Sequence, residues 1–492
     1  MRPRPGTIRA LAISLAVSAA GAADAAAQGV RGNATTTVRY IEMRPITQDT
    51  VAEDLVTVLP DGSFEYQGIP VSCVTGLACF FFRSTDVQHA VLATQDVGFT
   101  AWGLGVEGLS VTGMLRGRAD LGGDLTWPRS DDAFDAILAY AELNRGDVRA
   151  RLGRQRTMSR LGLTGFDGAS VMYDGFGSVE FEAYGGRSLM RGLNEPREQA
   201  LRGVQEFAMD TLVTLLIGAT ARYEPVAGTA IGVRYQREIF SNRVALVSER
   251  ASAEFSTSQF RPLMFDAAVD YDFAFGRIGK AHVTARAPQW RGLVVEATGR
   301  RHLPYFELNT IWGFFSPVGY HEAEARATWR RSPQLSAWAS AALRRYEEAD
   351  ATVIIRAIEQ QGTRFAVGGS WRATPALAVD ASYRMDRGFG AFVSSGDASA
   401  HWQLTPAIGV SLDGTAFQQI EQFRVGEGIV YGGGASADVR ILPAAWLSGG
   451  ATMYRQNFEN RPGIANWNQV RAWTALRTSF GRDPGAARRG VR

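Results

Sequence analysis

Charged side chains recur at every second residue along several otherwise apolar stretches of this 492-residue chain. In the segment around Arg116 and Arg118, the alternate positions hold Leu115, Gly117 and Ala119. Facing rows of opposite charge can line a water-filled passage and select polar solutes over apolar ones. The predicted pore-lining residues are Arg116, Arg118, Glu322, Glu324, Arg326, Asp380, Arg384, Asp386, Arg471 and Arg477. The alternative is that these charges pair with one another and only solvate a wall.

Residues suited to catalysis or to cofactor binding do not gather into a recognisable motif. The five histidines, at positions 89, 282, 302, 321 and 401, have no nucleophile at a catalytic spacing. Gly185-Gly-Arg-Ser188 lacks the second glycine of a nucleophile elbow. We therefore expect no enzyme activity, no metal ion and no cofactor. The net charge of +3 gives no reason to expect a nucleic-acid partner.

The elements that carry these charges are predicted to be β-strands, because the pattern has a period of two. Val379, Ala381 and Tyr383 alternate with Asp380, Ser382 and Arg384. Strict alternation over such a length is typical of strands with one polar and one apolar face, and not of helices.

A repeat in the second half of the chain predicts where these strands turn. Trp329, Trp371 and Trp402 each stand four residues before a proline that follows Ser or Thr, whereas Trp446 follows Pro443. Tryptophan near a turn suits a membrane interface, where its apolar ring meets lipid and its N–H meets the headgroups. We predict that Trp329, Trp371, Trp402 and Trp446 form an interface girdle. The alternative is that they fill the corners of a soluble β-domain.

The N-terminus predicts export. Arg2, Arg4 and Arg9 precede an apolar run from Ala10 to Ala20 and the small residues Ala25-Ala-Ala27, which is the pattern of a signal peptide cleaved after Ala27. No later apolar stretch approaches the roughly 18–20 residues of a membrane helix. An exported chain of this kind that lies in a membrane must form a closed barrel. A secreted soluble protein remains the alternative.

The predicted fold is therefore all-β: a single transmembrane antiparallel up-and-down β-barrel of about 18–22 strands, with short periplasmic turns and longer extracellular loops. The predicted parts are a signal peptide at residues 1–27, an N-terminal strand and disulfide segment at 28–95, the barrel at 96–480 and a disordered tail at 481–492. The loop from Arg187 to Asp210 is a candidate inward constriction through Arg187, Arg191, Arg197 and Arg202. An ordinary external loop is an equal alternative.

Cys73 and Cys79 are the two cysteines of the chain. An exported protein meets an oxidising compartment, so a structural disulfide is expected between them. The six-residue separation excludes a CxxC redox motif.

Two short motifs resemble those of a known barrel family. Arg151-Leu-Gly153-Arg154-Gln155, followed by Gly165-Phe-Asp-Gly168, resembles the Gly-Arg-Gln and Phe-Asp-Gly pair of alginate-export-type and related porin-like outer-membrane barrels. The resemblance implies a single-chain barrel that passes an anionic sugar polymer or small solutes through an Arg-lined lumen. From the residues alone, Gly153 is expected to bulge its strand and re-aim Arg154. Phe166 to Gly168 is expected to form a turn.

These observations predict a porin-like outer-membrane channel for diffusion or export of small polar or anionic solutes through a charged lumen. The expected partners are outer-membrane lipid, the solute and the barrel insertion machinery, since the last alternating strand ends on Phe480 and resembles the C-terminal signal of bacterial outer-membrane barrels. The alternatives are a structural or assembly barrel without an open pore and the barrel subunit of an export system. A siderophore-type receptor is disfavoured, because only 68 residues precede the regular strands, too few for its plug. The sequence does not predict the oligomeric state.

Overall fold

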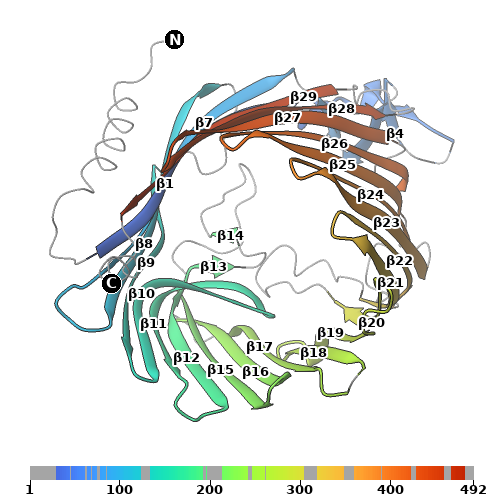
Figure 1. Cartoon of the computed structure of the whole chain (residues 1–492). Helices are drawn as coiled ribbons and strands as arrows, with labels where there is room; N and C mark the ends of the chain where they lie inside the picture. Colours follow the sequence, from blue (N-terminus) through green and yellow to red (C-terminus); the bar gives the residue numbers. More distant parts are fainter. Residues whose placement is uncertain are drawn as a thin grey trace.

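Twenty-two antiparallel strands form one closed sheet (Figure 1). The computed structural model describes residues 29–44, 46–60, 62, 64–67, 69–74, 78–84, 86–123, 133–191, 195–196, 213–241, 246–260, 262–303, 319–347, 360–388, 391–422, 428–458 and 467–481. The ring closes because β1 (Gly29–Met43) pairs with β7 (Gln88–Trp102) on one side and with β29 (Trp467–Gly481) on the other. This confirms the predicted fold class, with a strand number inside the predicted range.

The ring follows chain order, so each strand pairs with its neighbours along the chain. Between β7 and β29 its strands are β8 (Leu109–Gly123), β9 (Phe134–Arg145), β10 (Val148–Ser159), β11 (Gly162–Tyr173), β12 (Val179–Ser188), β15 (Thr214–Val226), β16 (Thr229–Phe240), β17 (Leu246–Thr257), β18 (Met264–Asp272), β19 (Arg277–Arg286), β20 (Leu293–His302), β21 (Tyr320–Ser332), β22 (Leu335–Tyr346), β23 (Gln361–Thr374), β24 (Leu377–Gly388), β25 (Ala391–Thr405), β26 (Ile408–Gln422), β27 (Gly428–Leu442) and β28 (Ala445–Phe458). Two short strands, β13 (Met190–Arg191) and β14 (Glu195–Pro196), form a separate pair.

The four prolines of the repeat each begin a two-residue turn. Pro333, Pro375, Pro406 and Pro443 directly follow β21, β23, β25 and β27. The hydroxyl before the proline caps three of these turns. Ser332 Oγ accepts a hydrogen bond from the N–H of Gln334, and Thr374 and Thr405 accept equivalent bonds from Ala376 and Ala407. Such side-chain bonds to the backbone two residues on fix tight turns locally, and the repeat thus encodes one end of the barrel, which we call the short-turn end.

Connections at the opposite end, the long-connection end, include much longer ones. β20 and β21 are separated by residues 303–319, and β22 and β23 by residues 347–360. The described part of the chain contains no helix long and apolar enough to span a membrane. The predicted signal peptide and tail residues 482–492 lie outside the described residues, whereas Gly481 is the last residue of β29.

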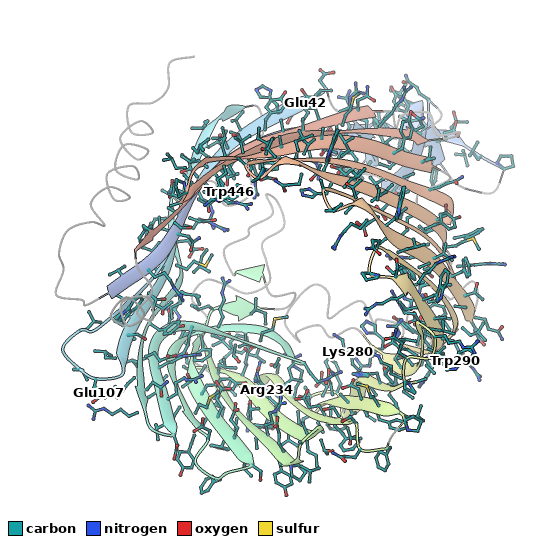
Figure 2. The ribbon with its side chains drawn as sticks, viewed as in Figure 1. Glu42, Glu107, Arg234, Lys280, Trp290 and Trp446 are labelled. Atoms are coloured by element: carbon teal, nitrogen blue, oxygen red, sulfur yellow. A yellow bond between two sulfur atoms is a disulfide. The ribbon has the colours of Figure 1, made fainter. Side chains whose placement is uncertain are left out.

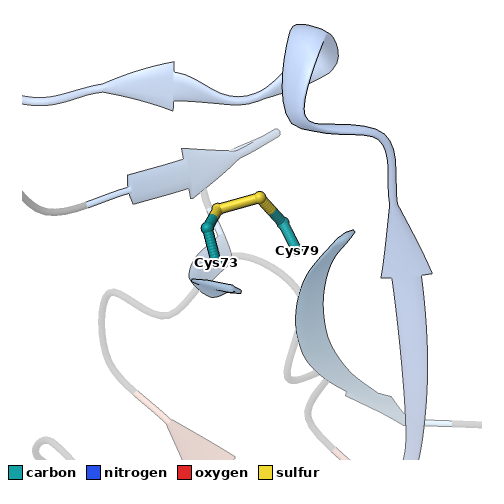
Figure 3. Close-up of a disulfide and its surroundings, with 2 residues drawn as sticks. All are labelled: Cys73 and Cys79. Atoms are coloured by element: carbon teal, nitrogen blue, oxygen red, sulfur yellow. A yellow bond between two sulfur atoms is a disulfide. The ribbon is translucent and has the colours of Figure 1, made fainter. Parts of the chain in front are cut away.

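A small sheet is inserted between β1 and β7 at the long-connection end. Its elements are β2 (Ile46–Val51), η1 (Glu53–Leu55), β3 (Thr57–Val58), β4 (Phe64–Tyr66), β5 (Ile69–Val74) and β6 (Ala78–Ser84), and its strand order is β2-β6-β5-β4-β3. Its core contains Val51, Val71 and Phe81 together with Cys79. The predicted disulfide is present and joins register partners Cys73 and Cys79 (Figure 3).

The barrel also begins earlier in the chain than the sequence analysis expected. The expected start was Asp96, but β1 and the first half of β7 are full members of the ring. The long insertion between them interrupts the period-two pattern, which concealed the first hairpin. The expected N-terminal segment is therefore a barrel strand, a small disulfide-bonded sheet and the start of a second barrel strand.

Candidate functional site

The polar faces of the strands meet on the inside of the barrel. Register partners in a sheet share a face, and Arg300, Glu322 and Arg344 are successive partners on β20, β21 and β22. Side chains two strands apart converge on the same face, since Arg364 of β23 reaches Glu322 at 2.9 Å across β22. Convergence across an intervening strand is favoured on the concave side of a curved wall. Figure 2 places Lys280, the partner of His302 on this face, at the inner side, with Trp290 at the outer side.

The outer face is apolar and open. Leu343, Leu152 and Val283 are 69%, 67% and 56% exposed, although each belongs to a regular barrel strand. Leu343 alternates with Arg344 along β22, so the two side chains leave opposite faces. Large exposed apolar side chains on the outer face of barrel strands are typical of a wall that faces lipid.

Register places all ten predicted pore-lining residues on the inner face. Arg116 pairs with Asp96, which pairs with Thr35, which in turn pairs with Arg477. The others follow by the same pairing: Arg118, Glu322, Glu324, Arg326, Asp380, Arg384, Asp386 and Arg471. They do not form one site, however, but divide among separate parts of the wall.

One group is an ion-pair network on β20 to β24. The carboxylate of Glu322 has no exposed side-chain surface and receives hydrogen bonds from Arg300, Arg344 and Arg364. Arg364 also donates to Glu324 at 2.8 Å, and Arg344 donates to Asp386 at 3.2 Å. Three guanidinium groups thus face three carboxylates, which leaves this group close to neutral. Sequence alternation marked the acidic members, and the same alternation could have identified the three arginines.

The β10–β11 hairpin leaves the ring of strands and bends into the lumen. β10 pairs with β9 only as far as Arg154, and β11 pairs with β12 only from Phe166 onward. Beyond these points, the two strands pair with each other (Figure 1). The bend begins at Gly153, whose φ is +125° and where a Cβ would lie 2.3 Å from the carbonyl oxygen of Ala139. A side chain is excluded there, so glycine is required for the exit from the wall.

The inner wall of β12 to β16 holds the middle of the hairpin. Phe166 stacks on Tyr184 with ring centroids 5.5 Å apart, and both pack against fully buried Leu216. The side-chain oxygen of Gln236, also buried, accepts hydrogen bonds from Thr164 Oγ1 at 3.2 Å and from the Tyr184 hydroxyl at 3.3 Å. Buried aromatic contact and a satisfied buried amide together fix the hairpin against the wall.

The tip of the hairpin is fastened farther round the ring. Arg250 donates to the carbonyl oxygen of Leu161 at 3.0 Å. Arg160 lies 2.9 Å from Nδ1 of His282 and 3.8 Å from Asp270. These contacts join the turn between β10 and β11 to β17, β18 and β19. The hairpin is therefore a fixed inner layer against β12 to β19, held along its length.

An arginine-rich cluster lies beside the free side of the hairpin. Arg116 forms a two-bond pair with Asp96, and Arg118 lies 3.4 Å from Asp135. Arg154 forms a two-bond pair with Asp167, at 2.8 and 2.9 Å. The cluster also includes exposed Arg156, which interacts electrostatically with Asp135, Arg116 and Arg154.

We call these seven residues the hairpin cluster: Arg116, Arg118, Arg154, Arg156, Asp96, Asp135 and Asp167. Four guanidinium groups and three carboxylates give it a formal charge of +1. Arg156 forms no salt bridge with any residue that the structure describes. Alternation in the sequence marks Arg116 and Arg118, and the short motif marks Arg154. Arg156 was not predicted, although it is two residues beyond Arg154 on the same face.

The wall of β24 to β27 carries the opposite charge. Asp380, Asp397 and Asp413 line one inner cavity of about 510 Å³. Asp397 accepts a hydrogen bond from Thr415 at 2.8 Å, and Asp380 accepts one from Ser370. None of these three aspartates forms a salt bridge within the described part of the chain. Positive and negative charge are thus concentrated on different sectors of the lumen wall.

One predicted girdle residue lies on the wrong face. Trp329, Trp371 and Trp402 occupy the apolar face, but Trp446 is the register partner of Arg440 and Arg477 on the polar face. The Arg440 guanidinium lies 5.6 Å from the Trp446 ring centroid, a cation–π contact. Arg440 stands three residues before Pro443, as Arg330 does before Pro333. Its partner beyond the turn must therefore point inward, so the girdle assignment for Trp446 is corrected.

The predicted constriction loop is only partly described. Arg187 belongs to β12 and is the register partner of Leu215, which is exposed on the outer face. Arg191 belongs to β13, and β13 and β14 lie within the outline of the ring in Figure 1. Arg197 and Arg202 lie outside the described residues. The element whose described side chains lie inside the ring is instead the β10–β11 hairpin.

The expected turn at Phe166 to Gly168 is wrong. Those residues lie within β11, and the chain turns earlier, at Arg160 and Leu161. Phe166 is needed as the buried anchor of the hairpin, and Gly168 packs directly against Gly186, where a Cβ would clash with the backbone. Among the described residues, no group of three or more His, Cys, Asp or Glu is arranged to hold a metal ion.

Comparison with known proteins gives distant structural likenesses. No family model matches the chain, and no curated protein matches its sequence. Among solved structures, it is similar to Acinetobacter baumannii OccAB1, with 10% identity and a TM-score of 0.38 over 92% of this chain and 98% of that one. It is also similar to a BenF-like porin from Pseudomonas fluorescens Pf-5, with 10% identity and a TM-score of 0.37 over 93% and 100%. For Pseudomonas aeruginosa OccD3 (OpdP), the identity is 9% and the TM-score 0.35, over 92% of each chain. Likeness at this level does not assign the chain to a family.

Proposed function

We propose that this protein is an outer-membrane channel that passes small polar solutes, anions in preference to cations, through the charged lumen of its barrel. The observation that carries the proposal is the hairpin cluster beside a hairpin that bends into the lumen and narrows it. In a water-filled passage, the narrowest part contributes most to resistance and brings the solute closest to wall charges. A net positive charge at that level favours anions.

The placement in the outer membrane is supported by the two faces of the wall. Apolar side chains such as Leu343 and Val283 are exposed outside, while the charged side chains are inside. By the usual arrangement of such barrels, the short-turn end is periplasmic and the long-connection end extracellular. The insertion machinery that assembles outer-membrane barrels is the partner that we infer for biogenesis.

The test is planar-bilayer conductance of the refolded protein, with reversal potentials in a KCl gradient. We expect ohmic steps and preference for chloride. Arg156→Ala removes one unit charge. At about 8 Å in water such a charge stabilises chloride by about 0.5 kcal/mol and destabilises potassium by about as much, so the chloride-to-potassium permeability ratio should fall about fivefold. Arg237→Ala is the matched control, because Arg237 lies on the outer face beside Glu249 at 3.9 Å.

A second variant tests the hairpin itself. Replacing residues 155–165 with two glycines removes the part of the hairpin that forms no strand pairing with β9 or β12. The lumen becomes wider, so the single-channel conductance should rise. A correctly folded barrel that gives no steps in either form would contradict the proposal. That result would favour the alternatives, a structural or assembly barrel or the barrel subunit of an export system. A conducting barrel whose selectivity is unchanged by Arg156→Ala would contradict the assigned role of the hairpin cluster.

A further inference from the structure

The outer face of β16 to β23 contains a furrow that the proposed channel does not use. It has a volume of about 1000 Å³. Its outer-face floor is made of small residues on successive strands, which are Ala253, Ala267, Ala281, Gly299 and Ala323. Larger apolar side chains flank them, which are Ile231, Phe255, Val283 and Leu343.

Open space above the floor is clearest at Gly299. A Cβ added there would meet no atom within 4 Å, and its φ lies outside the left-handed region. The glycine is therefore not required by the backbone. Its register partners are Val283 on β19 and Ala323 on β21, and neither side chain covers the position. An acyl chain would find apolar walls and no protein atom to displace.

Basic groups stand at one end of the same furrow. Arg301, His321 and Arg345 line it and belong to the outer face near the ends of β20, β21 and β22. Arg301 uses Nε and Nη2 to bind Glu347, at 2.7 and 3.1 Å, which leaves Nη1 outside that pair. Arg345 is exposed. Arg301 and Arg345 against Glu347 leave a formal charge of +1.

This charged end lies toward the long-connection end, which the proposed function assigns to the extracellular side. We propose that the furrow binds a phosphorylated glycolipid of the outer leaflet, with acyl chains along the small-residue floor and a phosphate against Arg301 and Arg345. Guanidinium groups suit phosphate because their fork of donors matches its oxygens. Glu347 positions Arg301 for this contact and lies 3.3 Å from His321. The inference rests on the membrane placement proposed above.

Lipid binding by the full-length protein in non-ionic detergent micelles would test this, with fluorescent lipid A as the probe and dephosphorylated lipid A and inorganic phosphate as competitors. The variant Arg301→Gln/Arg345→Gln should weaken lipid A binding at least tenfold, because it removes both charge-assisted contacts to the phosphate and the loss of one contact alone corresponds to about tenfold. Gly299→Leu should weaken it comparably by filling the furrow. Arg237→Gln and Gly396→Leu are matched outer-face controls away from the furrow, and each should change affinity less than about twofold. At Gly396 a Cβ would have no neighbour closer than 3.8 Å.

The outcomes separate the two halves of the proposal. Equal affinity for dephosphorylated lipid A, or unchanged binding by the double arginine variant, would overturn the phosphate contact. Unchanged binding by Gly299→Leu would overturn the acyl furrow. Competition by inorganic phosphate as strong as by lipid A would identify a phosphate site without a lipid. Conductance of the same preparations is measured in parallel. Loss of lipid binding with normal conductance would refute the lipid site and leave the proposed channel function standing. A barrel that binds lipid but does not conduct would refute only the proposed channel function.

Discussion

Arg154 donates two hydrogen bonds to Asp167 across the β10–β11 hairpin, just beyond the bend at Gly153. A third donor of Arg154, Nη1, binds the carbonyl oxygen of Ala136 on the neighbouring strand β9 at 2.9 Å. The pair therefore ties the base of the inward hairpin to the wall that it leaves. It also holds both of these charged groups within the hairpin cluster.

Asp167→Asn should make the channel more selective for anions. The substitution removes one of three carboxylates from the hairpin cluster and raises its formal charge from +1 to +2. We expect the chloride-to-potassium permeability ratio to rise about fivefold, by the same charge arithmetic as for Arg156→Ala but with the opposite sign. Reversal potentials measure it. If Asp167→Asn and Arg156→Ala shift the reversal potential in the same direction, the effect is not electrostatic.

Glu322→Gln should destabilise the barrel. The buried carboxylate holds Arg300, Arg344 and Arg364, and its loss leaves guanidinium groups without a matching charge. Breaking a buried pair from one side costs about 3–5 kcal/mol. The measurement is the urea midpoint of unfolding in detergent or lipid. Glu224→Gln is the control, since its pair with Arg222 is exposed and should contribute no more than about 1 kcal/mol.

The stability of the long-connection end should depend on Glu347 at acid pH. The hydrogen bonds from Arg301 lower the pKa of Glu347 below its ordinary value of 4.5. A group with a lower pKa in the folded state stabilises the fold fully above the unfolded pKa and loses that contribution as the pH falls through the folded pKa. Thermal unfolding between pH 7 and pH 3 should therefore show a smaller loss for Glu347→Gln than for the parent protein. Parallel pH profiles for the two proteins would refute this role.

Removing the disulfide should loosen the small sheet and leave the barrel unchanged. Cys73→Ser/Cys79→Ser releases a short loop whose closure contributes about 2 kcal/mol on the chain-entropy estimate. Hydrogen exchange in residues 46–84 should increase, while exchange in the barrel strands and the single-channel conductance should not. Faster exchange throughout the barrel would mean that the small sheet supports the ring.

Local chemistry accounts for much of what the sequence predicted. The four proline turns follow from the fixed φ of proline and, in three of them, from the preceding hydroxyl. The two faces follow from alternation, because both features depend on neighbouring residues. The faces of Arg116 and Glu322 were also predicted from alternation. Alternation does not predict which residues form salt bridges with them. Closeness to a turn does not determine the face of a tryptophan. Trp446 lies near a turn but points inward, because its face depends on the number of residues that separate it from Pro443.

The inward hairpin could not be found by these means. β10 and β11 alternate as wall strands do, and what separates them from the wall is contact with residues far along the chain. Thr157 meets Arg234 across 77 residues of sequence, and Arg160 meets His282 across 122. The sequence by itself determined the strands from β8 to β29 as a class, the four proline turns, the disulfide and the polarity of each face, since these are set within a few residues. Only the tertiary structure decided that one hairpin bends into the lumen and which charges it gathers there, because that choice depends on the burial of Phe166 against Tyr184 and Leu216 on other strands.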